Sequence, residues 1–347
     1  MTNTRFTIFC VMLVVSCWVL PSCGKKPEEP QAKKIIVGFS QIGAESDWSI
    51  ANSRSVKAEA AKRGVDLRFS DGQQKQENQI KALRSFIDQK VDLIAVSPVV
   101  ETGWQSVMED IQAAGIPVIL TGREIDVTDK SLYVTFIGSD FVEEGRRAAR
   151  WFVENTQGEV KVFELRGTPG ASCAVDRKKG FDEVIAKHPR ITIILSQDGD
   201  FERAKGKMVM EAFLKTPASK ECNALYAHND DMGLGAIQAI KAAGRKPGTD
   251  IKIVSIDGVR AAFDAMLVGE LNCTVECNPL LGPTLFDVVE AVLAAKKLGD
   301  NGAKLKLVKP AMLETLKGEI FEKRLLTKEG VFDQSDVKEV IKTRTEY

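Results

Sequence analysis

Short apolar runs alternate with amphipathic segments along most of the chain. The apolar runs predict strands at 35–39, 65–69, 93–96, 116–120, 160–165, 191–195, 224–227 and 251–256. The segments between them place apolar residues at helical spacing, as Trp104, Val107, Met108 and Ile111 do. Strands that alternate with helices predict parallel sheets joined by right-handed crossovers.

This alternation occurs in two sets, one before Asp140 and one after it. A chain of 347 residues with 44% hydrophobic residues can bury a large core and usually divides into more than one domain. We therefore expect two α/β lobes.

Polar residues stand where two of the predicted strands end. His228, Asn229, Asp230 and Asp231 follow one of these strands, and Asp257 ends the next one, directly before Gly258. Parallel α/β sheets bind small molecules at the carboxyl ends of their strands, so these residues predict a ligand site. Asp231 is expected to cap the helix that follows, and Gly244 to end it.

These strand ends, together with Asp176-Arg177-Lys178-Lys179-Gly180-Phe181, resemble the sugar-binding proteins of bacterial ABC transporters. Within that group the ribose- and galactofuranose-binding family is the nearest, and the resemblance covers residues 36–294. It implies a type I periplasmic binding protein, in which two Rossmann-like lobes with parallel sheets are joined by a three-strand hinge. The crossings are expected near Ser139, Cys277 and residue 312. One lobe would then hold 35–139 plus 278–312, and the other 140–277 plus 313–347.

The resemblance also implies eight ligand-binding residues. They are Gln41, Trp48, Arg123, Arg177, Phe201, Asn229, Asp257 and Glu276. Guanidinium and carboxylate groups make the paired hydrogen bonds that suit sugar hydroxyls, and aromatic rings cover the C–H face of a sugar. Taken singly, Arg177 is equally compatible with an ion pair on a helix surface, and Trp48 with the core.

Three positions in the first lobe depart from the family pattern. Gly122 stands where relatives have aspartate, Ser49 where the galactofuranose-binding relatives have arginine, and Asp47 where they have glycine. A pocket that lacks one carboxylate and one guanidinium cannot pair the same hydroxyl groups. We expect a related pentose or hexose to bind at least about tenfold tighter than galactofuranose.

The first 22 residues predict an export signal. Arg5 precedes an apolar segment, 6–20, that is shorter than the roughly 20 residues needed to span a bilayer. Leu20-Pro21-Ser22-Cys23 resembles the lipobox of bacterial lipoproteins, which implies that Cys23 becomes a lipid anchor at the start of the mature chain. Ordinary cleavage near Ser22, with Cys23 unmodified, is the alternative. Residues 23–34 are expected to form a polar tether.

The charge and cysteine content exclude several kinds of protein. Lys+Arg and Asp+Glu each number 48, so there is no positive excess of the kind that nucleic acid binding requires. Apart from the proposed anchor Cys23, the cysteines outside the leader are Cys173, Cys222, Cys273 and Cys277, and export permits disulfides among these four. Cys273 and Cys277 are excluded as a pair, since four steps along a strand separate them by roughly 13 Å.

We expect neither a metal nor another cofactor, and no enzymatic activity. No cysteine–histidine spacing for zinc, calcium loop or nucleotide-binding glycine loop is present, and the two histidines accompany no Gly-x-Ser-x-Gly motif. The resemblance implies a monomeric receptor that closes two lobes around one monosaccharide and delivers it to an ABC permease and its ATPase. It would face the periplasm or the cell exterior, held to a membrane by its lipid.

Two other functional hypotheses remain open at this stage. One is a sensing module that reports its ligand to a chemoreceptor or histidine kinase. The other is a secreted enzyme built on the same fold, which would convert the sugar that it binds.

Overall fold

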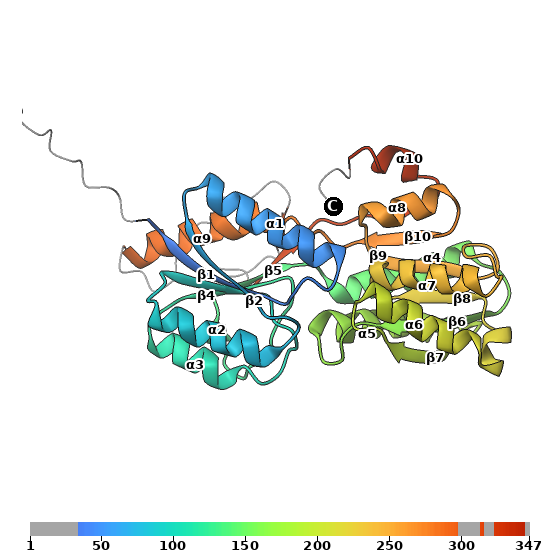
Figure 1. The fold of residues 1–347 in the computed structure, drawn as a ribbon, viewed down its shortest axis with the longest axis horizontal. Coiled ribbons are helices and arrows are strands. Elements are labelled where there is room, and N and C mark those ends of the chain that lie inside the picture. The colour runs from blue at the N-terminus through green and yellow to red at the C-terminus, as the bar shows by residue number, and fades with distance from the viewer. Residues whose placement is uncertain (1–33, 298–312, 316–322, 344–347) are drawn as a thin grey trace, which may run out of the picture. The chain divides into compact units, whose positions relative to one another are not determined.

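Two α/β sheets form the frame of the molecule (Figure 1), seen here in a computed structural model that describes residues 34–297, 313–315 and 323–343. Each of the eight predicted apolar runs overlaps a strand. The predicted fold class is confirmed, because both sheets are parallel except at one edge. The predicted signal peptide, Cys23 and nearly all of the tether lie outside the described residues.

The first sheet has the strand order β11-β12-β5-β4-β3-β1-β2, and β11 runs antiparallel to β12. Its strands are β1 (Ile36–Gln41), β2 (Asp66–Asp71), β3 (Leu93–Val96), β4 (Val118–Thr121), β5 (Thr135–Gly138), β11 (Leu313–Thr315) and β12 (Arg324–Thr327). Every residue of β3, β4 and β5 is buried, as expected for strands covered on both faces.

The second sheet has the order β13-β10-β9-β8-β6-β7, and β13 runs antiparallel to β10. Its strands are β6 (Val160–Arg166), β7 (Ile191–Asp198), β8 (Ala224–Ala227), β9 (Lys252–Asp257), β10 (Cys273–Glu276) and β13 (Val331–Asp333). We call each sheet with its helices a lobe, the first lobe being the one that contains β1.

The helices of the first lobe cover both faces of its sheet. They are α1 (Asp47–Lys62), α2 (Gln76–Asp88), α3 (Gln105–Ala113) and α9 (Gly282–Lys297), with a short 3-10 helix at Lys130–Leu132. Figure 1 shows α1 and α9 on one face of the sheet, and α2 and α3 on the other.

The second lobe contains the remaining helices. They are α4 (Phe141–Asn155), α5 (Ser172–Ile185), α6 (Arg203–Leu214), α7 (Asp230–Ala242), α8 (Arg260–Leu267) and α10 (Val337–Val340), with a 3-10 helix at Pro217–Lys220. Helices α4 and α5 pack against each other, and so do α6 and α7.

The chain passes between the sheets three times within the described residues. Residues 139–140 connect β5 to α4, 277–281 connect β10 to α9, and 328–330 connect β12 to β13. The expected third crossing near residue 312 was therefore wrong, as was the assignment of 313–315 and 324–327 to the second lobe. The physical reason is that β12 pairs in parallel with β5 and extends the first sheet before the chain leaves it.

Capping residues determine where two helices of the site begin. The side chain of Ser46 accepts from the Ser49 amide and starts α1 with a capping box. Helix α7 begins after Asn229, whose Oδ1 accepts from the Met232 amide at 3.0 Å. The prediction that Asp231 caps this helix was wrong, since Asp231 lies in the first turn.

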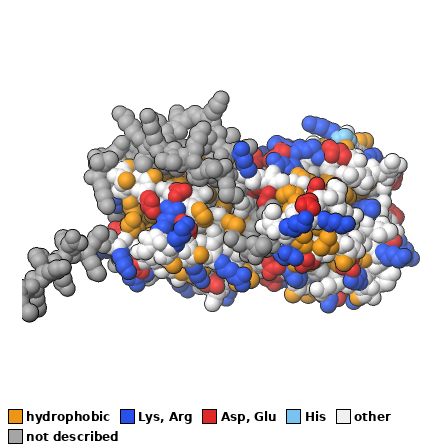
Figure 2. Space-filling model, turned by 90° about the horizontal axis from the view of Figure 1, so that it is seen from above, with side chains coloured by type: hydrophobic (Ala, Val, Ile, Leu, Met, Phe, Trp, Pro, Cys, Tyr) orange, Lys and Arg blue, Asp and Glu red, His pale blue; other side chains and the backbone are white. Residues whose placement is uncertain are grey.

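The surface carries charges of both signs, and the cysteines of the described residues are buried. Basic and acidic side chains are interspersed on the described part of the face in Figure 2. None of the described helices combines the length and the apolar character that a membrane span requires. Cys173, Cys222, Cys273 and Cys277 are buried free thiols.

Candidate ligand-binding site

A pocket lies between the two lobes, where strands of both sheets end. The space between its lining atoms measures about 340 Å³, part of it open to solvent. The lining residues are Glu45, Ser46, Trp48, Gly122, Arg123, Phe141, Cys173, Arg177, Phe201, Asn229, Asp257 and Cys277. Asp257 is the last residue of β9, and each of the others stands in a loop or in the first turns of a helix after a strand, at the edge of the sheet that the sequence predicted.

The structure brings six of the eight expected residues into this pocket. They are Trp48, Arg123, Arg177, Phe201, Asn229 and Asp257. The other two do not line it. The Gln41 amide is used within the first lobe, where Nε2 donates to Asn52 Oδ1 at 2.9 Å and Oε1 accepts from the Ile42 amide. Glu276 Oε2 instead accepts from the Gly330 amide at 2.8 Å, so this side chain connects the end of β10 to the third crossing.

Glu45 is a pocket residue that the resemblance did not assign. Its Oε1 lies 3.7 Å from a terminal nitrogen of Arg123, and its Oε2 is buried without a hydrogen-bond partner among the described residues. Burial raises the pKa of the Glu45 carboxyl, and Arg123 opposes this effect. A carboxylate oxygen in this position can accept a hydrogen bond from a ligand hydroxyl.

Arg123 and Phe201 form a polar and aromatic wall across the pocket. Arg123 donates to the Val99 carbonyl at 2.8 Å, and its guanidinium lies 5.0 Å from the centre of the Phe201 ring. Trp48 completes the aromatic part, with its indole nitrogen bonded to the Cys277 carbonyl. Flat rings beside a guanidinium suit a ligand that has both C–H faces and hydroxyl groups.

Arg177 is held by three groups of the second lobe. Its Nε donates to Glu144 at 2.7 Å, one terminal nitrogen donates to the His228 carbonyl, and the other lies 3.5 Å from Asp257 Oδ1. Burial opposes the charge of Arg177, but Glu144 in particular outweighs this and keeps its pKa well above the ordinary value. Burial also raises the pKa of the Asp257 carboxyl, which Arg177 only partly offsets.

The side-chain amide of Asn229 makes hydrogen bonds within the protein and also lines the pocket. Besides capping α7 with Oδ1, it donates from Nδ2 to the Phe201 carbonyl at 3.0 Å. An amide nitrogen has two hydrogens, so one remains for a ligand.

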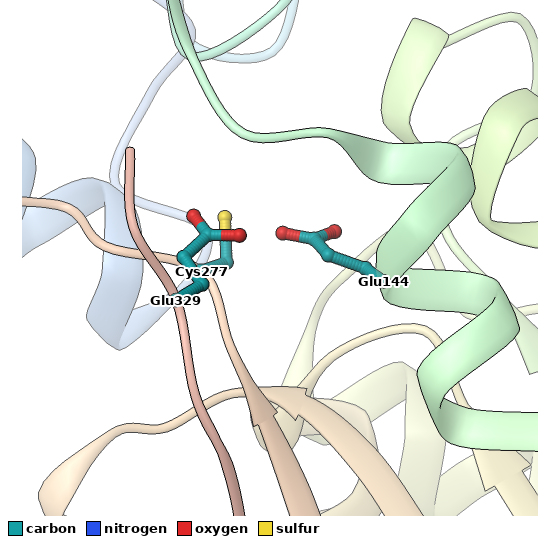
Figure 3. A group of neighbouring side chains, drawn as sticks. All are labelled: Glu144, Cys277 and Glu329. Atoms are coloured by element: carbon teal, nitrogen blue, oxygen red, sulfur yellow. The ribbon is translucent and has the colours of Figure 1, made fainter. Parts of the chain in front are cut away.

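Two acids and a thiol lie together where the three crossings meet (Figure 3): Glu144 and Cys277, which are buried, and Glu329, which is half-buried. Glu144 extends from α4 toward Cys277 and Glu329, and potential ligating atoms of the three lie within 4.8 Å of one another. Glu329 Oε1 accepts from Thr327 Oγ1 at 2.6 Å, from the Asn278 amide at 3.3 Å, and from Ser139. One carboxyl oxygen therefore joins all three crossing segments.

The two lobes also bond to each other at the mouth of the pocket. Arg203 of α6 donates to Asp47 at 2.9 Å and to Asp231 at 2.8 Å, and the Asp47 amide donates to Asp231 at 2.7 Å. A backbone bond of 2.8 Å joins the Glu101 amide to the Gly170 carbonyl. The bonds of Asp47 and of Glu101 thus connect the first lobe to the second.

Sequence and structure comparisons agree with this arrangement. A family model described as a periplasmic binding protein domain matches residues 37–297. The galactofuranose-binding protein YtfQ of Escherichia coli (strain K12) is 50% identical over 84% of this chain and 92% of its own.

Two solved structures with bound sugars are also similar. One is the arabinose ABC transporter binding protein of Shewanella sp. ANA-3 bound to L-arabinofuranose, with 48% identity, a TM-score of 0.79 and coverage of 90% of this chain and 96% of its own. The other is a Mycobacterium smegmatis protein in complex with β-D-fucofuranose, with 47% identity, a TM-score of 0.79 and coverage of 89% and 95%.

Proposed function

Since the chain belongs to the periplasmic binding protein domain family, we propose that it is the sugar-binding receptor of an ABC import system. The observation that carries the proposal is the chemistry of the pocket between the lobes. Two guanidinium groups, the carboxyl groups of Glu45 and Asp257 and three aromatic side chains converge on one small volume. Planar ionic groups pair with hydroxyls, and aromatic faces cover C–H surface, so the combination fits one monosaccharide.

We further propose that the ligand is an aldose in its five-membered ring form. Support comes from relatives at 47–50% identity whose names or bound ligands are galactofuranose, L-arabinofuranose and β-D-fucofuranose. Of the three positions that depart from the family pattern, Gly122, which replaces an aspartate, lines the pocket, whereas Ser49 and Asp47 flank its lining residue Trp48. We therefore propose a furanose other than galactofuranose as the preferred ligand.

Binding and delivery would be linked by movement of the lobes about the three crossings. The contacts of Asp47 with Arg203 and Asp231 favour a closed arrangement, and a ligand that touches both lobes adds to them. The closed form would then be presented to the membrane permease and its ATPase. Cys23, acylated after removal of the leader, would keep the receptor at the membrane as an exported lipoprotein.

Retention of sugar from a mixture tests this proposal. The protein is dialysed against equal amounts of several pentoses and hexoses, desalted and denatured, and the released ligand is identified by mass spectrometry. We expect one monosaccharide to be enriched and chemically unchanged, and Asp257→Ala to retain much less of it. Recovery of no sugar, or of a product with altered mass, would contradict a binding role.

A further inference from the structure

The backbone at Asp257 is held in an unusual conformation. Its φ is +129°, a value that residues with a side chain rarely adopt, and Gly258 follows with φ +75°. This conformation directs the carboxyl group of Asp257 into the pocket wall, 3.5 Å from Arg177. Such a conformation persists only where neighbouring groups impose it.

Asp230 supplies the bonds that impose it. Its Oδ2 accepts from the Gly258 amide at 2.8 Å and from the Val259 amide at 2.9 Å, the two N–H groups that directly follow Asp257. Its Oδ1 accepts from Thr274 Oγ1 at 2.8 Å and from the Ser255 hydroxyl. Asp230 is fully buried and is not among the pocket-lining residues.

The four hydrogen bonds that Asp230 accepts connect the ends of three neighbouring strands. Ser255 belongs to β9, Thr274 to β10, and Asp230 follows β8 as the first residue of α7. Thr274 Oγ1 also accepts from the Gly258 amide at 3.1 Å. The turn after Asp257 is thus held by groups from both neighbouring strands. It fixes the position of the Asp257 carboxyl group relative to Arg177.

We propose that Asp230 is a positioning residue for sugar binding, and that it acts by fixing the turn that presents Asp257 to the ligand. The proposal rests on the proposed function and adds to it a residue that does not touch the sugar. It predicts that the contribution of Asp230 to affinity depends on the presence of the Asp257 carboxyl group.

Asn272 provides a matched control in the same sheet. This residue is also buried, and it bonds the other end of β9 by accepting from the Ile253 amide at 2.8 Å and donating to the Gly248 carbonyl at 3.0 Å. Asn272→Ala removes a comparable set of buried bonds at the end of the strand remote from the pocket. It is expected to lower thermal stability with less than a twofold change in affinity.

A double-mutant cycle tests the dependence of Asp230 on Asp257. Dissociation constants for L-arabinose, D-fucose, D-galactose and D-ribose are measured for the wild type, Asp230→Ala, Asp257→Ala and the double variant. For the tightest of these sugars we expect Asp230→Ala to weaken binding at least tenfold alone, and less than twofold when Asp257→Ala is already present. An equal loss in both backgrounds would overturn the proposal.

Two further variants keep the test decisive. Asp230→Asn retains an oxygen acceptor for the two amides, so we expect it to recover most of the affinity lost in Asp230→Ala. If Asp230→Ala does not fold, Thr274→Val weakens the same turn from the opposite strand and is expected to show the same dependence on Asp257.

A sugar-free crystal structure of the variant separates this proposal from the proposed function. We expect Asp257 in Asp230→Ala, or in Thr274→Val, to leave the positive-φ conformation and its carboxyl group to move away from Arg177. An unchanged turn would overturn the positioning role whether or not a sugar binds. Failure of every sugar to bind the wild type, with a displaced turn in the variant, would instead count against sugar binding alone.

Discussion

The indole nitrogen of Trp48 donates a hydrogen bond of 2.9 Å to the carbonyl oxygen of Cys277. Trp48 stands at the start of α1 in the first lobe, and Cys277 is the first residue of the second crossing. Both line the pocket. A pocket residue of one lobe is thus bonded directly to a segment about which the lobes would move.

Replacing Trp48 should therefore weaken sugar binding more than it weakens the fold. We expect Trp48→Phe to raise the dissociation constant by roughly three- to tenfold, the net worth of about one buried hydrogen bond. Trp104→Phe is the control, because Trp104 is fully buried outside the pocket and donates to the Val100 carbonyl at 2.7 Å. It should lower the melting temperature and leave affinity unchanged; similar affinity losses in both variants would contradict this account.

Gly122 has no side chain, and the Trp48 ring occupies the space beside it. It has φ +65°, and a Cβ at this position would lie 2.7 Å from Cη2 of the Trp48 ring. We expect Gly122→Ala to weaken sugar binding at least about tenfold, equivalent to roughly 1.4 kcal/mol, because the ring must move. It should also lower the free energy of unfolding by about 1–2 kcal/mol through backbone strain.

Gly115 offers the matched comparison for strain without crowding. Its φ is +68°, and a Cβ there would have nothing within 4 Å. Gly115→Ala should lose similar stability in chemical denaturation and keep its affinity in calorimetry. Equal affinity for Gly122→Ala and Gly115→Ala would show that the Trp48 ring is not held against Gly122 when sugar binds.

The carboxyl group of Glu329, which joins the three crossings, should make the stability of the fold depend on pH. Burial, and after it the neighbouring Glu144, raise the pKa of Glu329 to about 8 from an ordinary value of 4.5. The folded chain therefore binds this proton more tightly than the unfolded chain, so the stabilisation is complete below about pH 4.5 and is lost as pH rises through about 8. Asp230, whose pKa burial raises to about 7, acts in the same direction.

We expect Glu329→Gln to reduce this loss of stability with rising pH, because the amide keeps an oxygen acceptor and cannot ionise. Urea denaturation at several pH values between about 5 and 9 measures how the free energy of unfolding changes with pH. Glu339→Gln is the control, since that side chain is 81% exposed. Identical pH slopes for the wild type and Glu329→Gln would contradict the assignment of the proton to Glu329.

The lipid anchor is tested separately, on residues outside the described structure. We expect the wild-type protein to sediment with membranes and Cys23→Ser to appear as a soluble or unprocessed form, because acylation of Cys23 is the proposed attachment. Cys17→Ser changes a cysteine of the same leader and should behave as the wild type does. Equal partitioning of the Cys23→Ser and wild-type proteins would exclude lipidation.

The sequence predicted most of the fold because apolar runs and their spacing directly reflect burial in parallel strands. It failed at β11 and β12, because two short antiparallel strands carry little periodic signal and the pairing of β12 with β5 is set by contacts distant in the sequence. Strand β5 was also missed, since its four residues, Thr135–Gly138, begin with a polar residue and are too few to show a pattern.

The site was predictable where a polar residue ends a strand or follows closely after it. Asn229 and Asp257 are such residues, and both line the pocket. Gln41 occupies a similar position, but its side chain finds partners within its own lobe, which only the local conformation determines. Glu45 and Glu329 were not assigned because their roles depend on loop direction and on crossings that come together only in the folded chain.

Isothermal titration calorimetry with a panel of pentoses, hexoses and galactofuranose tests the central claim most directly. The account predicts one saturable site per chain for at least one furanose-forming aldose, and binding of galactofuranose at least about tenfold weaker than that of the best sugar. Galactofuranose as the tightest ligand would contradict the specificity inferred from Gly122, Ser49 and Asp47. Absence of saturable binding for every sugar in the panel would contradict the function itself.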